Sequence, residues 1–384
     1  MHNDFSSDKM HEKYIECVND NIPKEIATAL EEANAHIALL GLEGSWHRRI
    51  LETYYTDEKR RKLLTNKRLV TKVNTFAFCD NLKDVYTRLF TDALKVIKEF
   101  AELSNDLKEI YQKYTAQERN GTHEDLLSLG RDLKNSEYTM VFVYTSFHNF
   151  TFLEFKKEDL ETIHSNLHGI SIKTDKIDKN DAAIEFARFI VASDHGLYAP
   201  LLIDNSSFIS LFNKSKWYDK GLNRKQISNL LEVAWDVKSW PESDKLPKRK
   251  DGSTFDDMTY LELYTKRCME WTGGNIELID YYLEYLHSNS GKLNNKTLNS
   301  IFENSQHHIA KLIGRWVEKI DKFSETCLSR FKVIWRIGAN DYLADDNFLV
   351  ECNLVTKDSN EDLTLSSNAL KNYMKNKYGD SIDS

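Results

Sequence analysis

The chain has 384 residues, of which 41% are hydrophobic and 29% are charged, and its formal net charge is −8. The length is that of two or three domains, and the acidic balance disfavours a dedicated binder of duplex DNA. With only 4 Pro and 14 Gly, a sandwich of many strands joined by tight turns is disfavoured as well. We therefore expect a mainly α (α+β) protein.

The cysteines and the N-terminus indicate the compartment. Five cysteines stand far apart and form no Cys-x-x-Cys pair, which is typical of reduced thiols in a cytoplasmic protein. The polar N-terminus does not resemble a signal peptide, and no apolar run approaches the roughly 20 residues of a membrane span. We expect a cytoplasmic protein with no membrane partner.

The first part of the chain is predicted to be helical and carries a basic segment. Helices are expected at 8–20 and 23–40, and a third helix begins after Ser45. Residues 47–72, the basic patch, hold nine Lys or Arg and three acidic residues. The residues of the patch that we predict to bind phosphate or nucleic acid are Arg48, Arg49, Tyr54, Lys59, Arg60, Arg61, Lys62, Lys67 and Arg68.

The chemistry of the basic patch suits RNA, DNA or another polyanion. Arginine side chains can hold phosphates with two hydrogen bonds, and aromatic rings stack on bases. Two alternatives stay open. The patch could be a solvated helix surface whose basic stems cover apolar neighbours, or its charges could pair with acidic groups elsewhere in the chain.

Two long helices are the predicted scaffold. Between Leu82 and Tyr114 the apolar residues recur in alternating steps of four and three, the spacing of a coiled-coil seam. A second stripe of this kind covers 298–335. The two helices would pack against each other, against a protein partner or against a second copy of the chain.

One small antiparallel β-hairpin is expected between these helices. Residues 138–145 and 149–155 are rich in aromatic and branched side chains and are separated by a short turn, with 169–173 as a further strand. The remaining predicted helices cover 123–134, 157–167, 180–193, 205–213, 223–239, 257–271, 275–287 and 365–375. The segment 240–255, with two prolines, is the predicted linker.

These elements predict four regions. Residues 1–135 form an N-terminal helical domain, and 136–240 form an α+β region with the hairpin. Residues 257–355 form a C-terminal helical region, and 356–384 form a polar tail.

Glu161, His164 and His168 are the candidate metal ligands. On one helix their spacings of three and four place them on the same face, and a carboxylate with two imidazoles suits a divalent metal (Zn, Fe, Mn or Mg). The alternative is a pair of exposed or capping histidines, since Gly169 ends the helix directly after His168.

Asp194 and His195 are the candidate catalytic pair. They follow an apolar segment, and a carboxylate beside an imidazole can serve acid–base or metal chemistry. The alternative is a helix C-terminus, in which Gly196 makes the left-handed turn and His195 favours the negative end of the helix dipole.

Three short patterns resemble nuclease or polymerase motifs. Arg119 and His123 resemble the Arg-x4–6-His pair of HEPN-type ribonucleases, with a spacing one residue short. The segment 342–346 is similar to the Asp-Asp turn of reverse transcriptases, and Asp346 with Glu351 is similar to the carboxylate pair of metal-dependent nucleases. An acidic surface turn before a strand is the alternative for the last two.

The chain contains no Gly-x-x-x-x-Gly-Lys-Ser/Thr, Gly-x-Gly-x-x-Gly or Gly-x-Ser-x-Gly motif. A P-loop NTPase, a dinucleotide-binding dehydrogenase and an α/β-hydrolase are therefore disfavoured. The leading hypothesis is a cytosolic interaction or assembly protein that contacts nucleic acid or another polyanion through the basic patch. The competing hypothesis is a metal-dependent hydrolase or nuclease that uses Glu161, His164 and His168.

Overall fold

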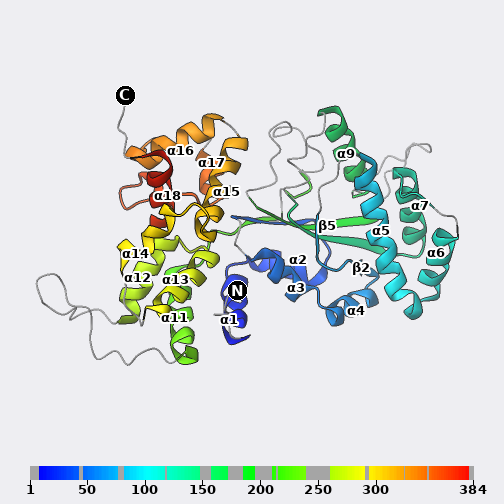
Figure 1. Ribbon diagram of the computed structural model, residues 1–384. Coiled ribbons are helices and arrows are strands. Elements are labelled where there is room, and N and C mark those ends of the chain that lie inside the picture. Colours follow the sequence, from blue (N-terminus) through cyan, green and yellow to red (C-terminus); the bar gives the residue numbers. More distant parts are fainter. Residues whose placement is uncertain are drawn as a thin grey trace, which may run out of the picture. The chain divides into compact units, whose positions relative to one another are not determined.

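The structure is a computed structural model, and it divides the chain into two compact units (Figure 1). The sheet unit comprises 22–40 and 47–217, and the helical unit comprises 1–21, 41–46 and 218–384. The residues that the structure describes are 8–42, 46–76, 82–116, 119–147, 157–171, 185–194, 210–212, 215–238, 260–289, 294–323, 325–343 and 346–379.

The sheet unit is built on a six-stranded sheet with the strand order β2-β4-β5-β1-β6, in which β3 also pairs with β4. Its strands are β1 (Ile37–Gly41), β2 (Arg68–Val70), β3 (Asn74–Thr75), β4 (Thr139–Thr145), β5 (Ala187–Asp194) and β6 (Lys216–Tyr218). Strand β4 runs parallel to both neighbours. Arg68 of β2 lies opposite Thr139, and Ala187 of β5 lies opposite Met140.

Both faces of this sheet are covered, and this explains its sequence. All residues of β1 are buried, as are residues 140–145 of β4. Helices α3 (His47–Tyr54), α5 (Leu82–Phe100) and α7 (His123–Asn135) pack against β4. A parallel strand that is buried on both faces is apolar throughout and does not alternate between polar and apolar residues.

The predicted fold class is therefore wrong. The protein is an α/β fold with a parallel sheet, not a mainly α protein with one antiparallel hairpin. Residues 139–145 do form a strand, but its described partners are β2, β3 and β5, and the predicted return strand at 149–155 lies outside the described residues.

The predicted helix at 180–193 is also wrong, because Ala187–Asp194 is strand β5. The predicted helix at 23–40 ends early, since α2 covers Lys24–Glu32 and β1 follows.

The predicted helix 82–114 is divided in two. Helix α5 ends at Phe100, a short 3-10 turn covers Ala101–Leu103, and α6 covers Asn105–Thr115. Ser104 has an extended backbone, so α6 leaves α5 in a new direction and packs back on it. Figure 1 shows α6 and α7 beside α5. The apolar stripe fails at this point, since Leu103 is 63% exposed.

The helical unit contains helices and one two-stranded sheet. Its described elements are α1 (Asp8–Asn19), α11 (Arg224–Lys238), α12 (Tyr260–Thr272), α13 (Ile276–Ser288), α14 (Asn295–Asn299), η2 (Ser300–Glu303), α15 (His308–Phe323), α16 (Glu325–Ile337), α17 (Asp346–Glu351), β7 (Val355–Lys357), β8 (Leu363–Leu365) and α18 (Asn368–Tyr378). The core includes the fully buried side chains of Tyr14, Tyr282 and Trp316.

The second long helix is also divided. The segment 298–335 contains parts of α14, η2, α15 and α16. The antiparallel hairpin in the described structure is β7–β8, where Val355 lies opposite Leu365. It stands at the start of the segment that was predicted to be a polar tail. The predicted linker at 240–255 lies outside the described residues.

None of the described helices is long and apolar enough to cross a membrane.

Candidate functional site

The strand order of the sheet unit creates a switch point between β1 and β5. These strands are neighbours, but the chain leaves β1 toward β2 at one edge of the sheet and leaves β5 toward β6 at the other edge. Where outgoing connections diverge in this way, a crevice forms at the carboxyl ends of the two strands, and open α/β sheets bind ligands there. Two groups that the fold brings to this end are His47, which opens α3, and Asp194, the last residue of β5.

The connection from β1 to α3 has the length of a phosphate-binding loop. A P-loop has the pattern Gly-x-x-x-x-Gly-Lys-Ser/Thr between a strand and a helix. Here Gly41 ends β1, Trp46 stands at the second glycine position, His47 at the lysine position and Arg48 at the hydroxyl position. Trp46 has φ +57°, the left-handed conformation that glycine favours, and its ring centroid lies 4.9 Å from that of Tyr14.

His47 replaces the lysine with a side chain that carries no charge at neutral pH. The imidazole is 5% exposed, and burial lowers its pKa to about 4. Its ring centroid lies 6.0 Å from that of Trp217 in β6, in an edge-on arrangement. An imidazole held neutral in this way cannot neutralise a phosphate as a lysine ammonium does.

The positive charge at the start of α3 comes from the next two residues. Arg48 and Arg49 stand in the first turn of α3, and both are exposed. Arg48 donates from Nε to Glu52 Oε1 at 2.9 Å and lies 3.5 Å from Thr75 Oγ1 through Nη1. Helix N-termini favour anions, because their first amides lack backbone partners.

The carboxyl end of β4 carries no carboxylate. Its last residues are Tyr144 and Thr145, and the Tyr144 hydroxyl donates to the buried Asp92 of α5 at 2.9 Å. Asp92 also accepts from Arg88 Nε at 3.0 Å and from Lys95 Nζ at 3.2 Å. In P-loop NTPases an aspartate at a strand end and the Ser or Thr of the loop hold Mg²⁺. Here β4 ends without an aspartate and Arg48 stands at the hydroxyl position, so these two positions do not fit that arrangement; the aspartate at a described strand end is Asp194 of β5.

Three cations of the basic patch donate hydrogen bonds within the protein. Arg60 is fully buried, and its guanidinium donates to both carboxylate oxygens of Glu99, at 2.8 and 2.9 Å, and to Val70 O at 2.8 Å. Lys59 donates to Thr53 O at 3.0 Å, and Arg68 donates to Thr139 Oγ1 at 2.7 Å.

Other members of the basic patch lie at the surface. Lys67 Nζ lies 4.2 Å from the centre of the Tyr138 ring and 4.0 Å from Asp106 Oδ2. Arg61 and Lys62 are exposed on α4 (Asp57–Thr65), and Tyr54 is half-buried beneath Lys59. The internal pairing that the sequence left open as an alternative therefore accounts for Arg60.

The predicted metal ligands share helix α9 (Lys157–Gly169) but not one environment. His164 is 2% exposed, and burial lowers its pKa to about 4, whereas Glu161 is exposed and His168 is half-buried. Within the part of the chain that the structure describes, no group of three or more His, Cys, Asp or Glu could hold a metal ion. Of the predicted catalytic pair, Asp194 ends β5 and His195 lies outside the described residues.

The nuclease-like patterns are explained by structural contacts. Arg119 donates to Asp125 at 3.2 Å and lies 4.7 Å from the Tyr114 ring centre, while His123 opens α7 beside Tyr86. Thr122 and Asp125 form a capping box at the start of α7. The Asp346 carboxylate is fully buried and accepts two hydrogen bonds from Arg330, both at 2.9 Å.

Comparison with known proteins gives no family. No family matches the sequence, and none of the curated proteins matches it. Solved structures similar to this chain include a Walker-type ATPase of Pyrococcus abyssi, with 12% identity, 92% of this chain and 95% of that chain covered and a TM-score of 0.45. Another is the ORC2 protein of Aeropyrum pernix in ADPNP and ADP complexes, with 13% identity, coverage of 89% and 87% and a TM-score of 0.37. The ORC1 protein of Aeropyrum pernix in complex with DNA has 8% identity, coverage of 92% and 90% and a TM-score of 0.36.

The function predicted from the sequence is corrected by these findings. Arg60 of the basic patch is buried against Glu99, and His164 is buried whereas Glu161 is exposed, which contradicts a patch of solvent-facing cations and a metal site on one exposed helix face.

The sequence analysis missed the loop from β1 to α3 for an identifiable reason. A search for the full P-loop motif fails, because three of its four defining positions are substituted here. The signal that could have found the loop was the five-residue apolar run at 37–41, closed by Gly41 and followed by Gly44 and a helix. We had assigned that run to the end of a longer helix.

Proposed function

We propose that the sheet unit binds a nucleoside phosphate at the start of α3 and does not hydrolyse it. The observation that carries this proposal is the switch point between β1 and β5, with a loop of P-loop length leading into α3. Backbone amides at a helix start bind phosphate oxygens without any particular side chain, so the loss of the lysine removes affinity but leaves the anion site.

Two features of the loop support phosphate binding. Trp46, which stands at the second glycine position by spacing, has a left-handed backbone that its side chain makes unfavourable. Arg48 and Arg49 follow directly and supply the charge that His47 lacks. Arginine holds phosphates through two parallel hydrogen bonds, so it can replace the lysine as the partner of a terminal phosphate.

The same residues argue against hydrolysis. Phosphoryl transfer depends on a metal ion between the last two phosphates and on a group that positions the attacking water. Arg48 stands at the position of the metal-binding hydroxyl, and β4 ends in Tyr144 and Thr145. We therefore propose binding that is independent of Mg²⁺, and a protein that uses the nucleotide as a structural or regulatory ligand.

The proposed location is the cytoplasm. Four cysteines in the described structure are buried and free, which agrees with a reducing compartment. Burial raises the pKa of the Cys17 thiol to about 11, so this thiol stays protonated and unreactive.

A fluorescence titration tests this proposal. Wild-type protein is titrated with a fluorescent N-methylanthraniloyl derivative of ATP, once with EDTA and once with excess MgCl₂, and phosphate release from ATP is followed separately. We expect saturable binding in EDTA, a change of less than about twofold on adding Mg²⁺, and no turnover above background.

The matched variants are Arg49→Glu and Arg61→Glu. Both reverse one exposed arginine, the first at the start of α3 and the second on α4. Arg49→Glu should weaken binding about 10-fold or more, and Arg61→Glu less than about twofold. Equal effects of the two variants, or no saturable binding in the wild type, would refute the site. Turnover that requires Mg²⁺ would refute the loss of hydrolysis.

A further inference from the structure

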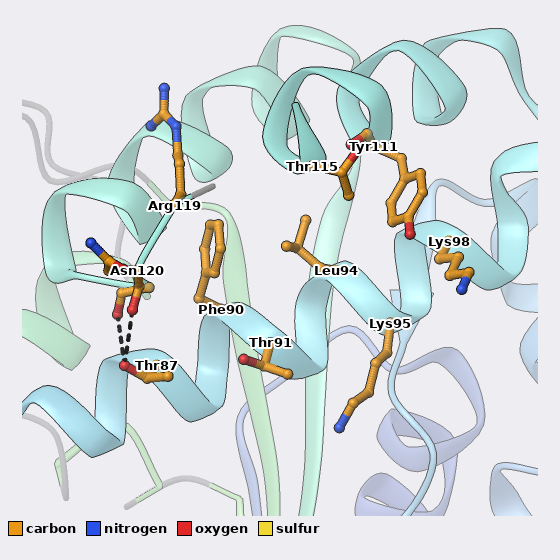
Figure 2. Close-up of a pocket in the computed structure, with 11 residues that line it drawn as sticks. Thr87, Phe90, Thr91, Leu94, Lys95, Lys98, Tyr111, Thr115, Arg119 and Asn120 are labelled. Carbon is orange, nitrogen blue, oxygen red and sulfur yellow. Dashed lines mark hydrogen bonds between the residues drawn. The ribbon is translucent and has the colours of Figure 1, made fainter. Parts of the chain in front are cut away.

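A groove in the sheet unit lies outside the proposed nucleotide site. It runs between α5, α6 and the segment 119–121, with a volume of about 350 Å³ (Figure 2). This is the lower end of the range found for small-molecule sites. None of the residues proposed to bind the nucleotide lines it.

The floor of the groove is apolar and aromatic. Phe90 and Leu94 stand one turn apart on α5, and Figure 2 shows Phe90 next to Arg119 and Leu94 next to Thr115. Phe90 is 3% exposed, and its ring centroid lies 5.9 Å from that of Tyr114 in a T-shaped arrangement, so it belongs to the packed base of the groove. A flat apolar ring would contact Leu94 and Tyr111, which are both half-buried.

The charge of the groove is positive. Of the eleven residues that line it, Lys95, Lys98 and Arg119 are cationic and none is acidic. Lys98 is exposed in the last turn of α5, and Figure 2 shows it on the Tyr111 side of the groove. Lys95 pairs with Asp92, and Arg119 pairs with Asp125.

One end of the groove is closed by a backbone contact. Thr87 Oγ1 donates to Asn120 O at 3.2 Å and lies 3.3 Å from Gly121 O (Figure 2). Gly121 has φ +70°, and a Cβ atom there would lie 2.8 Å from Thr87 Cα, so only glycine lets the segment approach α5 this closely. The groove is therefore a defined feature of the fold.

We propose that this groove binds a small organic anion, with an aromatic body on Leu94 and Tyr111 and an acidic group at Lys98. Lys98 is the principal anchor, because the other two cations already have carboxylate partners. The ligand must carry both parts, since neither the open apolar floor nor a solvated lysine holds a small molecule strongly by itself.

Calorimetric titration with 1-naphthyl phosphate tests the proposal, with 1-naphthol and inorganic phosphate as probes of the separate parts. At low ionic strength we expect one site per chain with a Kd on the order of 0.1 mM, and binding at least about 10-fold weaker for each partial probe. Titration with 1-naphthoate shows whether the site needs a phosphate or accepts any oxyanion. Both outcomes fit the proposed class of ligand.

Three variants locate the site. Lys98→Glu should weaken binding about 10-fold or more, while Lys83→Glu, an equal charge change in the first turn of α5, should change it less than about twofold. Thr91→Trp should fill the groove and abolish binding, with near-ultraviolet circular dichroism confirming that the variant is folded. Because Arg49 does not line the groove, Arg49→Glu should leave naphthyl phosphate binding unchanged, which separates this site from the proposed nucleotide site.

The proposal is overturned by any of three results. The first is an absence of binding up to several millimolar probe. The second is equal binding by the Lys98→Glu and Lys83→Glu proteins, and the third is full binding by folded Thr91→Trp.

Discussion

The two units bury different ionisable groups. The sheet unit holds three histidines, His36, His47 and His164, whose pKa values are each lowered to about 4, with burial as the first cause. The helical unit holds Asp219, whose pKa is raised to about 6 by burial even though its carboxylate accepts a hydrogen bond from Gly221 N at 2.8 Å. At pH 7 the three histidines are neutral in the folded state, whereas Asp219 holds its proton only below about pH 6. A buried histidine and a buried aspartic acid therefore respond to acid in opposite directions.

This difference predicts opposite pH dependences for the two units. The folded sheet unit binds fewer protons than the unfolded chain below pH 6.5, so it loses stability as the pH falls from 6.5 toward 4. The folded state of the helical unit holds a proton on Asp219 that the unfolded chain releases above pH 3.8, so this contribution is present at low pH and is lost as the pH rises through 6.

The largest expected effect is the acid sensitivity of the sheet unit. Between pH 7 and pH 5 the three histidines together should cost it on the order of 5 kcal/mol. Hydrogen exchange measured by mass spectrometry in a urea series reports the opening free energy of each unit separately. Asp219→Asn, which keeps the acceptor for Gly221, is the matched variant for the helical unit and should remove its opposite slope. Equal loss of stability in both units would contradict the comparison.

The next effect concerns the ion pair between the buried Arg60 and Glu99 in the sheet unit. Arg60 is fully buried and depends on Glu99, which is 33% exposed. Glu99→Ala leaves a buried guanidinium short of its main partner and should lower the free energy of unfolding by about 3 kcal/mol. Urea denaturation measures this loss. Glu102→Ala, at a nearby exposed position, is the control and should cost less than about 0.5 kcal/mol.

A double variant sharpens that result. If the cost arises from the uncompensated charge, Glu99→Ala combined with Arg60→Met should be more stable than Glu99→Ala alone. A double variant that is less stable than the single one would show that packing of the Arg60 stem, and not its charge, is the main contribution.

The smallest of the three expected effects is the difference in stability between alanine substitutions at two glycines, one in each unit. Gly274 of the helical unit has φ +85°, and a Cβ atom there would lie 2.5 Å from Leu222 O, whereas a Cβ at Gly169 of the sheet unit meets nothing within 4 Å. Gly274→Ala should cost about 2 kcal/mol, and Gly169→Ala should be neutral or stabilise by up to about 0.5 kcal/mol. Thermal unfolding of the two variants measures the difference. Equal unfolding midpoints for the two variants would show that the backbone around Gly274 can move to accommodate a Cβ atom.

The sequence predicted the helices of the helical unit better than the strands of the sheet unit. The pair at 257–271 and 275–287 corresponds to α12 and α13, and Asn275 caps α13 by accepting from Leu278 N at 3.2 Å. These helices are set by local signals, namely a capping side chain, a Gly-Gly break and an apolar stripe. Their limits therefore follow from a few neighbouring residues.

The two long apolar stripes led to wrong predictions, because their periodicity does not show where a helix ends. The spacing from Leu82 to Tyr114 continues across Ser104, although the chain turns there and α6 packs back on α5. Two shorter helices whose apolar faces both point into one core can show the same periodicity as a single long helix. The periodicity alone does not tell them apart.

Only some residues of the candidate site could be predicted from the sequence. Asp194 was singled out, and it ends β5 at the switch point, but it was assigned to the end of a helix. Arg48 and Arg49 were singled out as part of a broad patch, whereas the start of α3 distinguishes them from Arg60, which is buried in the same segment. Charge counts along the chain cannot separate a buried ion pair from an exposed phosphate ligand.

The sequence by itself determined local features: the start of the helix after Thr122, the break at Gly273 and Gly274, and limits close to those of α11, α12, α13 and α18. Only the tertiary structure decided the sheet and therefore the site. Arg68 and Thr139 pair across β2 and β4 although they are 71 residues apart. Parallel strands that are buried on both faces carry no alternating pattern, and their partners are brought together only when the connecting helices pack, so their order is a property of the folded chain as a whole.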